Sequence, residues 1–301
     1  MLHTSTVPKA RELSVAAEAV TVERLINSDE AEVLQFLAQR PIHTVTMMSL
    51  IHDNGIVSPF NRGAFYACRD LQGQLEGVAL VGHATLMETV SDRALASLAT
   101  VARECPNTHM IMGEKERVAD FWSHYSEAGR RQRLACREWL YELSWPVEAR
   151  EPVQGLRPAR VEELDLVMPI QAELAFAESG INPLEVDPQG FRERCLRRIE
   201  QGRTWVVVDE GLLIFKADVV SRTTEVIYLE GIWLREDCRR KNISTRFMSE
   251  LLRRLLENTK SICLLVNETN ESAHGFYRKC GFHFRATYET IFLPRKEQVQ
   301  N

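Results

Sequence analysis

The pattern of apolar and polar residues divides the chain into two long blocks. In each block the pattern predicts a similar order of helices and strands. Apolar residues at helical spacing open the first block, as at Val33, Leu34 and Leu37 after a capping sequence at residues 27–30. Short apolar runs bounded by turn residues predict strands. The elements expected in this block are helices from Glu30 and from Pro41, strands at 65–68 and 75–83, a helix at 91–104, a strand at 109–112, a helix at 117–126 and a strand at 133–143.

The second block repeats this order. It begins with a helix from Glu162 that Pro169 is expected to interrupt, much as Pro41 interrupts the first block. Residues 119–122 resemble residues 273–277 in the spacing of their aromatic side chains, which supports a duplication. The further elements expected are strands at 204–208, 212–219 and 226–234, a helix at 245–258, a strand at 261–266, a helix at 272–279 and a strand at 284–293.

A polar stretch with proline and glycine and without apolar periodicity separates the two blocks. It defines a linker at residues 147–155. We therefore expect an N-terminal lead-in at residues 1–22, a first lobe at residues 23–146 and a second lobe at residues 156–301. A chain of 301 residues is long enough for two domains of this size.

The composition, 45% hydrophobic and 26% charged, is typical of a globular protein. The net charge of −5, with basic residues interleaved among acidic ones, argues against a nucleic-acid surface. No apolar stretch approaches the about 20 residues of a membrane helix, and the N-terminus lacks a signal-peptide layout. The seven cysteines lack C-x-x-C spacing, which favours a reducing compartment over disulfides or zinc. We therefore expect a cytoplasmic protein without a metal site.

A strand, a cation-rich loop and an amphipathic helix follow one another within residues 227–256. The loop contains Arg239, Arg240 and Lys241, and the helix carries an apolar stripe. The backbone N–H groups and the dipole at the start of such a helix favour an anion, and three cations suit a diphosphate. The alternative interpretation is a solvent-exposed basic helix start without a ligand.

Residues 267–282 predict a short capped helix. Thr269 or Asn270 can cap its start, and Gly281 can supply the left-handed residue that ends it. Phe282 is then expected to pack back on the helix. Capping alone explains part of this pattern without any ligand.

The two segments together resemble the GNAT superfamily of acyl-CoA N-acyltransferases. The pattern N-x-x-A-x-x-x-Y-x-x-x-G-F fits Asn270, Ala273, Tyr277, Gly281 and Phe282. It lies downstream of an R-x-x-G-x-G/A-like loop, in which Asn242 and Ser244 stand where the family has glycines. The resemblance implies that the second lobe is a GNAT domain. The first lobe, which lacks a counterpart of the loop, resembles a degenerate GNAT-like copy.

The resemblance implies a mixed α/β fold of tandem lobes. Each lobe is expected to contain a mixed, mostly antiparallel sheet flanked by helices, with a parallel strand pair splayed at the acyl-CoA site. Acetyl-CoA is the implied co-substrate, held between the strands at 226–234 and 261–266. The residues expected to contact it are Ile232, Trp233, Leu234, Arg239, Arg240, Lys241, Asn242, Ile243, Ser244, Thr245, Asn270 and Ala273.

Acetyl transfer to an amine requires a base for the ammonium proton and an acid for the leaving thiolate. By resemblance, Tyr277 is the candidate acid, and Glu230, on an otherwise apolar strand, is the candidate base. A structural partner explains Glu230 equally well, because burying an unpaired carboxylate is costly. Glu173 and Glu178 are alternative carboxylates for the acceptor site. The expected acceptor is a primary amine of a small molecule or of a protein.

Two other interpretations remain open at this point. The first is a non-catalytic GNAT-like module that binds CoA or a protein partner through an impaired phosphate loop. The second is a cysteine nucleophile at Cys238, Cys263 or Cys280, which is disfavoured because structural cysteines are commoner and no histidine base stands out near them. The oligomeric state is not assigned.

Overall fold

The computed structural model describes residues 20–148, 153–238 and 243–294. Most of the expected lead-in, part of the expected linker and residues Arg239, Arg240, Lys241 and Asn242 of the expected phosphate loop lie outside the described residues. Residues 21 and 22, expected in the lead-in, belong instead to the first strand.

The two lobes are built from similar elements. The first lobe contains β1 (Thr21–Arg24), η1 (Asn27–Asp29), α1 (Glu30–Leu37), α2 (Pro41–Asn54), η2 (Pro59–Asn61), β2 (Gly63–Arg69), β3 (Leu75–Gly82), β4 (Ala84–Thr89), α3 (Asp92–Glu104), β5 (Met110–Glu114), α4 (Lys115–Tyr125), η3 (Ser126–Ala128) and β6 (Leu134–Ser144). The second lobe contains β7 (Arg157–Pro158), η4 (Val161–Glu163), α5 (Leu164–Ser179), α6 (Pro183–Val186), α7 (Pro188–Glu200), β8 (Thr204–Asp209), β9 (Leu212–Arg222), β10 (Val226–Leu234), η5 (Glu236–Cys238), α8 (Ile243–Leu255), β11 (Ser261–Asn267), α9 (Glu271–Lys279) and β12 (His283–Phe292).

The described strands form one 12-stranded sheet in the order β1-β2-β3-β4-β5-β12-β6-β11-β10-β9-β8-β7. Neighbouring strands are antiparallel except β4 with β5 and β10 with β11, which are parallel. The predicted mixed, mostly antiparallel sheet with one parallel pair in each lobe is therefore confirmed.

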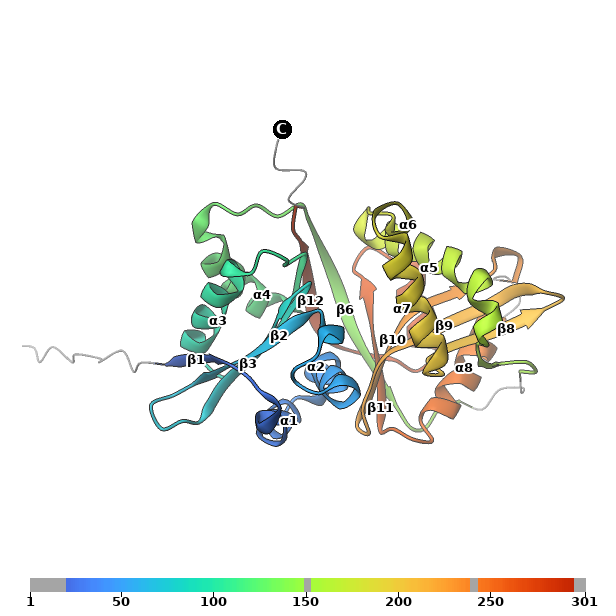
Figure 1. The fold of residues 1–301 in the computed structure, drawn as a ribbon. Helices are drawn as coiled ribbons and strands as arrows, with labels where there is room; N and C mark the ends of the chain where they lie inside the picture. Colours follow the sequence, from blue (N-terminus) through green and yellow to red (C-terminus); the bar gives the residue numbers. More distant parts are fainter. Residues whose placement is uncertain (1–19, 149–152, 239–242, 295–301) are drawn as a thin grey trace, which may run out of the picture.

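The last strands of the two lobes are exchanged. β12, the last strand of the second lobe, pairs with β5 of the first lobe, from Phe292 opposite Met110 to Tyr288 opposite Glu114. β6, the last strand of the first lobe, pairs with β11 of the second lobe. These two strands also pair with each other, and they run side by side between the lobes (Figure 1). Each lobe thus contributes the strand that completes the sheet next to the parallel pair of the other.

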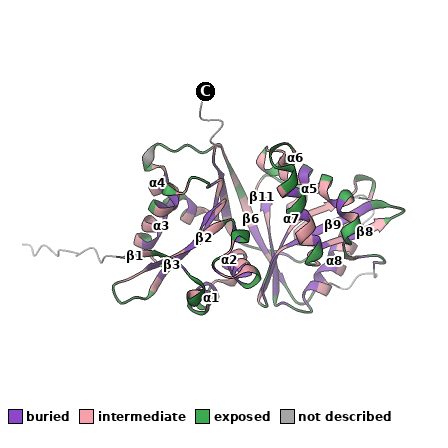
Figure 2. Ribbon diagram, viewed as in Figure 1, coloured by how far each residue is buried: buried purple, intermediate pink, exposed green. Residues whose placement is uncertain are grey.

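Strands inside each lobe, such as β3 and β9, are buried on both faces because helices cover both sides of the sheet there (Figure 2). Along β3, Val78 and Leu80 pack in the core with α1 and α2, whereas Ala79 and Val81 pack in the core with α3 and α4. This division follows from the period of two along a strand. In the second lobe, residues of β8 and β9 likewise alternate between a core with α5 and α7 and a core with α8.

Three sequence predictions about elements were wrong or incomplete. Pro169 lies inside α5, which is continuous, because the packing of Leu164, Val167 and Ala172 keeps the segment helical. The predicted strand at 75–83 ends at Gly82, and β4 begins two residues later without an obvious turn sequence. Helix α7 was not predicted, although Asp187 caps it by accepting a hydrogen bond from the Gly190 N–H at 3.0 Å.

None of the described helices combines the length and the apolar character that crossing a bilayer would need.

Candidate functional site

The parallel strands β10 and β11 separate part of the way along their length. Pairing joins Val226–Leu229 to Ser261–Leu264, but β10 continues to Leu234 and β11 to Asn267. The splayed pair expected in the second lobe is therefore present. The pairing with β11 ends at Leu229, so the next residues of β10 border an opening, where an extended ligand could lie along the strand.

A bulge in β10 lies at the mouth of this opening. The register with β9 passes from Glu230 opposite Asp218 to Trp233 opposite Lys216, which leaves one extra residue on β10. Gly231 has a φ of +59°, and a Cβ on it would lie 2.8 Å from the Lys216 Nζ. The bulge therefore requires glycine.

A buried ion pair between Lys216 and Asp218 contacts the bulge and stabilises it. Lys216 and Asp218 are 0% and 1% exposed in their side chains, and the Lys216 Nζ donates to the Asp218 Oδ2 at 2.6 Å. The same Nζ donates to the Gly231 carbonyl at 3.2 Å and to Gln171 at 2.6 Å. Arg198 donates to the same Asp218 Oδ2 at 3.0 Å, and the Thr204 hydroxyl donates to the Oδ1 at 2.8 Å. Because each charge has partners, the group can be buried, and it holds the bulge in place.

A groove of about 870 Å³ runs along the opened edge of β10 to the start of α8 and to α9. It is lined by most of the residues predicted to contact acetyl-CoA, namely Ile232, Trp233, Leu234, Ser244, Thr245, Asn270 and Ala273. Ile243 is the first residue of α8 and is not among the residues that line the groove. Residues 239–242 lie outside the described part of the chain, so their predicted contacts remain predictions.

Helix α9 has the caps that its sequence predicts. The Asn270 Oδ1 accepts a hydrogen bond from the Ala273 N–H at 3.1 Å, and Gly281 follows the helix with a φ of +94°. Phe282 is 2% exposed and packs in the core of the second lobe. Asn270, rather than Thr269, is therefore the capping residue, and its side-chain NH₂ group remains for other partners.

A second cavity, of about 920 Å³, lies between the lobes and meets the groove. Leu174, Ile232, Asn270 and Tyr277 line both spaces. Burial raises the pKa of Tyr277, so its phenol is protonated near neutral pH. The Tyr277 ring is held edge-on by Phe276 and Phe282, with ring centroids 5.1 and 5.7 Å away. Tyr277 thus lies where the groove meets the cavity.

Three carboxylates from three different elements line this inter-lobe cavity: Glu138 of β6, Glu178 of α5 and Glu230 of β10. Partial desolvation by the protein around the cavity, together with the charges of Glu230 and Glu138, raises the pKa of Glu178 to about 8, although part of this side chain is exposed to solvent. Burial raises the pKa of Glu138 to about 6, against the hydrogen bond that it accepts from the Thr290 hydroxyl at 2.9 Å. Two of the three carboxyl groups, Glu138 and Glu178, therefore titrate close to neutral pH.

The sequence left open whether Glu230 has a structural partner. The structure provides one, and this partner is a tyrosine. Tyr228 forms a side-chain hydrogen bond with Glu230, and burial followed by the Glu230 charge raises the pKa of Tyr228 well above its usual value. Of the alternative carboxylates, Glu178 lines the cavity, whereas Glu173 is exposed and does not line it. Glu138 was missed, because no local pattern reveals that the last strand of the first lobe lies beside β11.

The three cysteines considered as nucleophiles do not line either space. Cys263 and Cys280 are buried, and burial raises the pKa of the Cys263 thiol. A neutral, buried thiol is a poor nucleophile.

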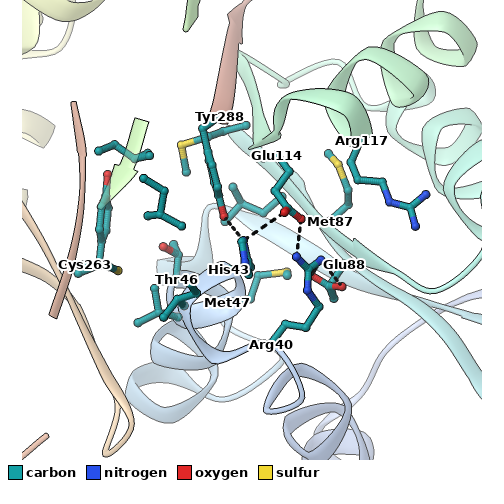
Figure 3. Close-up of a pocket in the computed structure, with 18 of the residues that line it drawn as sticks. Arg40, His43, Thr46, Met47, Met87, Glu88, Glu114, Arg117, Cys263 and Tyr288 are labelled. Atoms are coloured by element: carbon teal, nitrogen blue, oxygen red, sulfur yellow. Dashed lines mark hydrogen bonds and ion pairs between the residues drawn. The ribbon is translucent and has the colours of Figure 1, made fainter. Parts of the chain in front are cut away.

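The first lobe has its own splayed pair, but its side chains close the opening (Figure 3). Pairing of β4 with β5 ends at Leu86 and Met112. Beyond that point, Arg40 lies between Glu88 and Glu114 and forms ion pairs of 3.1 and 2.7 Å with them. The His43 Nδ1 lies 2.9 Å from the Tyr288 hydroxyl, which comes from β12. This cleft is therefore an internal polar contact between α2, β4, β5 and the exchanged strand.

The start of α3, where a phosphate would lie in the first lobe, holds a carboxylate of the protein itself. Ser91 caps the helix and donates a hydrogen bond to Glu76 at 2.6 Å. Arg93 pairs with the same carboxylate, and the hydrogen bonds from Arg93 and Ser91 lower the pKa of Glu76 to about 2. An anionic ligand would have to displace Glu76, which agrees with a degenerate first lobe.

Residues 172–282 match the model of the acetyltransferase (GNAT) family. No curated protein sequence matches the chain significantly.

Several solved structures share the fold over almost the whole chain. An acetyltransferase of the GNAT family from Colwellia psychrerythraea is 12% identical, with a TM-score of 0.55 over 91% of this chain and 100% of that one. A Drosophila protein has a TM-score of 0.63 at 12% identity, over 91% and 98%. A tandem GNAT protein from the clavulanic acid biosynthesis pathway has a TM-score of 0.54 at 13% identity, over 90% and 98%. At these identities the similarity shows the fold of tandem GNAT-like lobes and not the activity.

Proposed function

We propose, on the premise that the second lobe is a GNAT domain and the first lobe a degenerate GNAT-like copy, that this protein transfers an acetyl group from acetyl-CoA to a primary amine. The observation that carries the proposal is the meeting of the groove and the inter-lobe cavity at Ile232, Asn270 and Tyr277. A thioester in the groove and an amine in the cavity would meet at this junction. Proximity of this kind is a large part of catalysis of acyl transfer.

The first half of the reaction needs a base. The ammonium of the acceptor gives a proton to a carboxylate, and its lone pair then attacks the thioester carbon. Glu230 is the proposed base, because it lies on the strand that borders the groove and also lines the cavity. Glu178 and Glu138 support this role: a cluster of three carboxylates attracts an ammonium and keeps a proton acceptor near neutral pH.

The second half needs an acid. When the carbon–sulfur bond of the tetrahedral intermediate breaks, the CoA thiolate takes up a proton. Tyr277 is the proposed donor, because its phenol stays protonated and borders both spaces. As the intermediate collapses, the attacking nitrogen loses its second proton, and this proton restores the Tyr277 phenol. The carboxylate that received the ammonium proton returns it to solvent, so the atoms and charges balance.

The second candidate function is a non-catalytic GNAT-like module. Asn242 and Ser244, in place of the family's glycines, favour it, because side chains at a close-approach position weaken pyrophosphate binding. The carboxylates of the cavity favour the enzyme, since a purely structural protein gains nothing from three carboxyl groups whose like charges repel one another.

Calorimetric titration with acetyl-CoA tests the first requirement. Under the enzyme proposal, acetyl-CoA binds with a measurable heat and raises the melting temperature. If no heat and no thermal shift appear at millimolar acetyl-CoA, the enzyme proposal is wrong and the non-catalytic module is favoured.

Release of CoA thiol in the presence of amines tests the chemistry. Glu230→Gln and Tyr277→Phe should each lower kcat by about 10²–10⁴-fold, the range for losing a general base or acid, while acetyl-CoA binding persists. Glu173→Gln is the matched control, since Glu173 is exposed and does not line the cavity. Unchanged rates in both variants would remove the two assigned roles.

A further inference from the structure

The inter-lobe cavity continues into a second space that is rich in cations. This space, of about 540 Å³, shares Arg62, His83, Ala175 and Arg194 with the cavity that holds the three carboxylates. His109 and Arg133 line it farther on. An acceptor entering between the lobes would therefore meet arginines at one end of its path and carboxylates at the other.

Arg62 comes from the first lobe and is held in an uncommon backbone conformation. Its φ of 54° is left-handed, which few residues other than glycine adopt. The Arg62 N–H donates to the Pro59 carbonyl at 3.1 Å, and the Arg62 carbonyl accepts from the His83 N–H at 2.9 Å. Gly82 permits this contact, because a Cβ on it would lie 2.3 Å from the Arg62 carbonyl oxygen. Strain of this kind clusters at functional sites.

The positive charge of this region is not fully paired. The Arg62 guanidinium lies 3.0 Å from the His83 Nδ1, and within the described residues no carboxylate lies within ion-pair distance of Arg62. Arg194 pairs with Asp187 at 3.0 Å, but both side chains are more than a third exposed, so the pair is weak. Arg62 and Arg194 are close enough to repel each other, and Asp187 attracts both, so one carboxylate faces two guanidinium groups. Two neighbouring guanidinium groups beside a cavity suit an anion.

Arg133 extends the cationic surface. One of its terminal nitrogens donates to the Ser179 carbonyl at 2.8 Å, and its guanidinium lies over the Phe292 ring, 5.6 Å from the centroid. The Arg133 Nε is buried without a hydrogen-bond partner among the described residues. Ser179 follows Glu178, so the cationic and acidic parts of the site are adjacent along α5.

We infer that the acceptor carries an anionic group, a carboxylate or a phosphate, in addition to the amine that is acetylated. The amine is directed to Glu138, Glu178 and Glu230, and the anionic group to Arg62 and Arg194. This inference rests on the proposed function and narrows its substrate class. It also gives the first lobe a role, because Arg62 of that lobe selects the acceptor, although its own acyl-CoA cleft is closed.

Binding of matched amine pairs tests the inference without relying on turnover. The probes are glycine, β-alanine and 4-aminobutyrate, each paired with its neutral amide, and 3-aminopropylphosphonate as the phosphate-like arm. Calorimetry is done on the full chain with CoA present. We expect the anionic member of at least one pair to bind about 10- to 100-fold more tightly, the effect of one or two hydrogen bonds to a charged group. Equal affinity within every pair, or no binding at millimolar concentration, overturns the inference.

Variants assign the effect to the named arginines. Arg62→Gln and Arg194→Gln should each remove most of the preference for the anionic member, and Arg62→Lys should retain part of it. Arg192→Gln is the matched control, because Arg192 is exposed on the same helix as Arg194 and lines neither space. Circular dichroism confirms that each variant is folded. A preference that survives both arginine substitutions contradicts the inference.

Thiol release with the same panel separates the two proposals. Arginine-dependent binding of an anionic amine without any release of CoA would support the anion site and count against the acetyltransferase. Release of CoA with amines and amides alike, unaffected by Arg62→Gln, would support acetyl transfer and overturn the anion site. Release confined to anionic amines supports both.

Discussion

The hydroxyl of Tyr141, on the last strand of the first lobe, lies 3.1 Å from the Nδ1 of His274, on helix α9 of the second lobe, which borders the groove. Both side chains are buried. The His274 Nε2 lies 3.2 Å from the Glu268 carbonyl, and the Trp139 ring packs on His274 with centroids 4.5 Å apart. The position of α9 therefore depends on a strand of the other lobe.

Tyr141→Phe tests this dependence. Removing the hydroxyl leaves a buried histidine nitrogen without its partner, so we expect the free energy of unfolding to fall by about 1–2 kcal/mol. Urea denaturation measures the change. Tyr66→Phe is the control, since the Tyr66 hydroxyl forms no hydrogen bond with the described residues. Equal stability of wild type and Tyr141→Phe would show that the contact contributes nothing.

The exchanged strands predict that the two lobes cannot separate. Cutting the chain between Val147 and Val153 breaks the covalent link, but β6 remains paired with β11 and β12 with β5. We expect the cut halves to stay together in gel filtration and to unfold in one transition, because exchange joins the sheets by backbone hydrogen bonds. Two folded halves that elute separately would contradict the exchange.

Gly231→Ala tests the bulge in β10. Alanine disfavours a φ of +59°, and its Cβ would displace the buried Lys216 Nζ from Asp218. We expect a loss of about 2–4 kcal/mol, from the left-handed backbone and a disturbed ion pair together. Gly275→Ala is the control for stability, since nothing lies within 4 Å of a Cβ there and alanine favours a helix. A Gly231→Ala variant as stable as wild type would mean that the bulge tolerates a side chain.

Local sequence signals predicted the parts of the site that lie on one continuous segment. Asn270, Ala273 and Tyr277 recur at helical spacing on α9, so a short motif is enough to bring them together. The strand at 226–234 was predicted with its observed bounds, because an apolar run between turn residues is unambiguous. Element order also indicated the duplicated architecture.

The parts contributed by distant segments could not be predicted in the same way. Glu138 reaches the cavity only because β6 pairs with β11, and pairing between segments more than a hundred residues apart leaves no local pattern. Arg62 lines the cavity because of a loop conformation that depends on Gly82. Pro169 was misjudged because a proline weakens a helix locally, whereas the packing of α5 is decided by the whole fold.

Glu138→Gln tests how much the carboxylate cluster lowers the free energy of unfolding. The folded protein raises the pKa of Glu138 from 4.5 to about 6, so the native state holds this proton more tightly than the unfolded chain. The stability that comes with the proton is present below pH 4.5 and is lost as the pH rises through 6. We therefore expect Glu138→Gln to stabilise the protein by about 1–2 kcal/mol at pH 8 and by little at pH 4.

Urea denaturation at the two pH values measures the gain. The control is Glu142→Gln on the same strand, since Glu142 accepts a hydrogen bond from Arg285 at 2.7 Å and should give no gain at pH 8. A Glu138→Gln variant that is no more stable at pH 8 than at pH 4, relative to wild type, would contradict the raised pKa.

Glu178→Gln tests whether the charge of Glu178 takes part in acceptor binding. The surroundings of the cavity and the charges of Glu230 and Glu138 raise the pKa of Glu178 to about 8, so this side chain becomes negative as the pH rises through 8. A negative Glu178 attracts the ammonium of the acceptor, so we expect kcat/KM to rise more steeply between about pH 7 and 9 in the wild type than in Glu178→Gln, which cannot titrate. The same amine is used for both proteins, so that the ionisation of the acceptor contributes equally to the two pH profiles. Glu173→Gln, on the same helix but outside the cavity lining, should keep the wild-type profile. Identical pH profiles for the wild type and Glu178→Gln would show that the charge of Glu178 does not contribute.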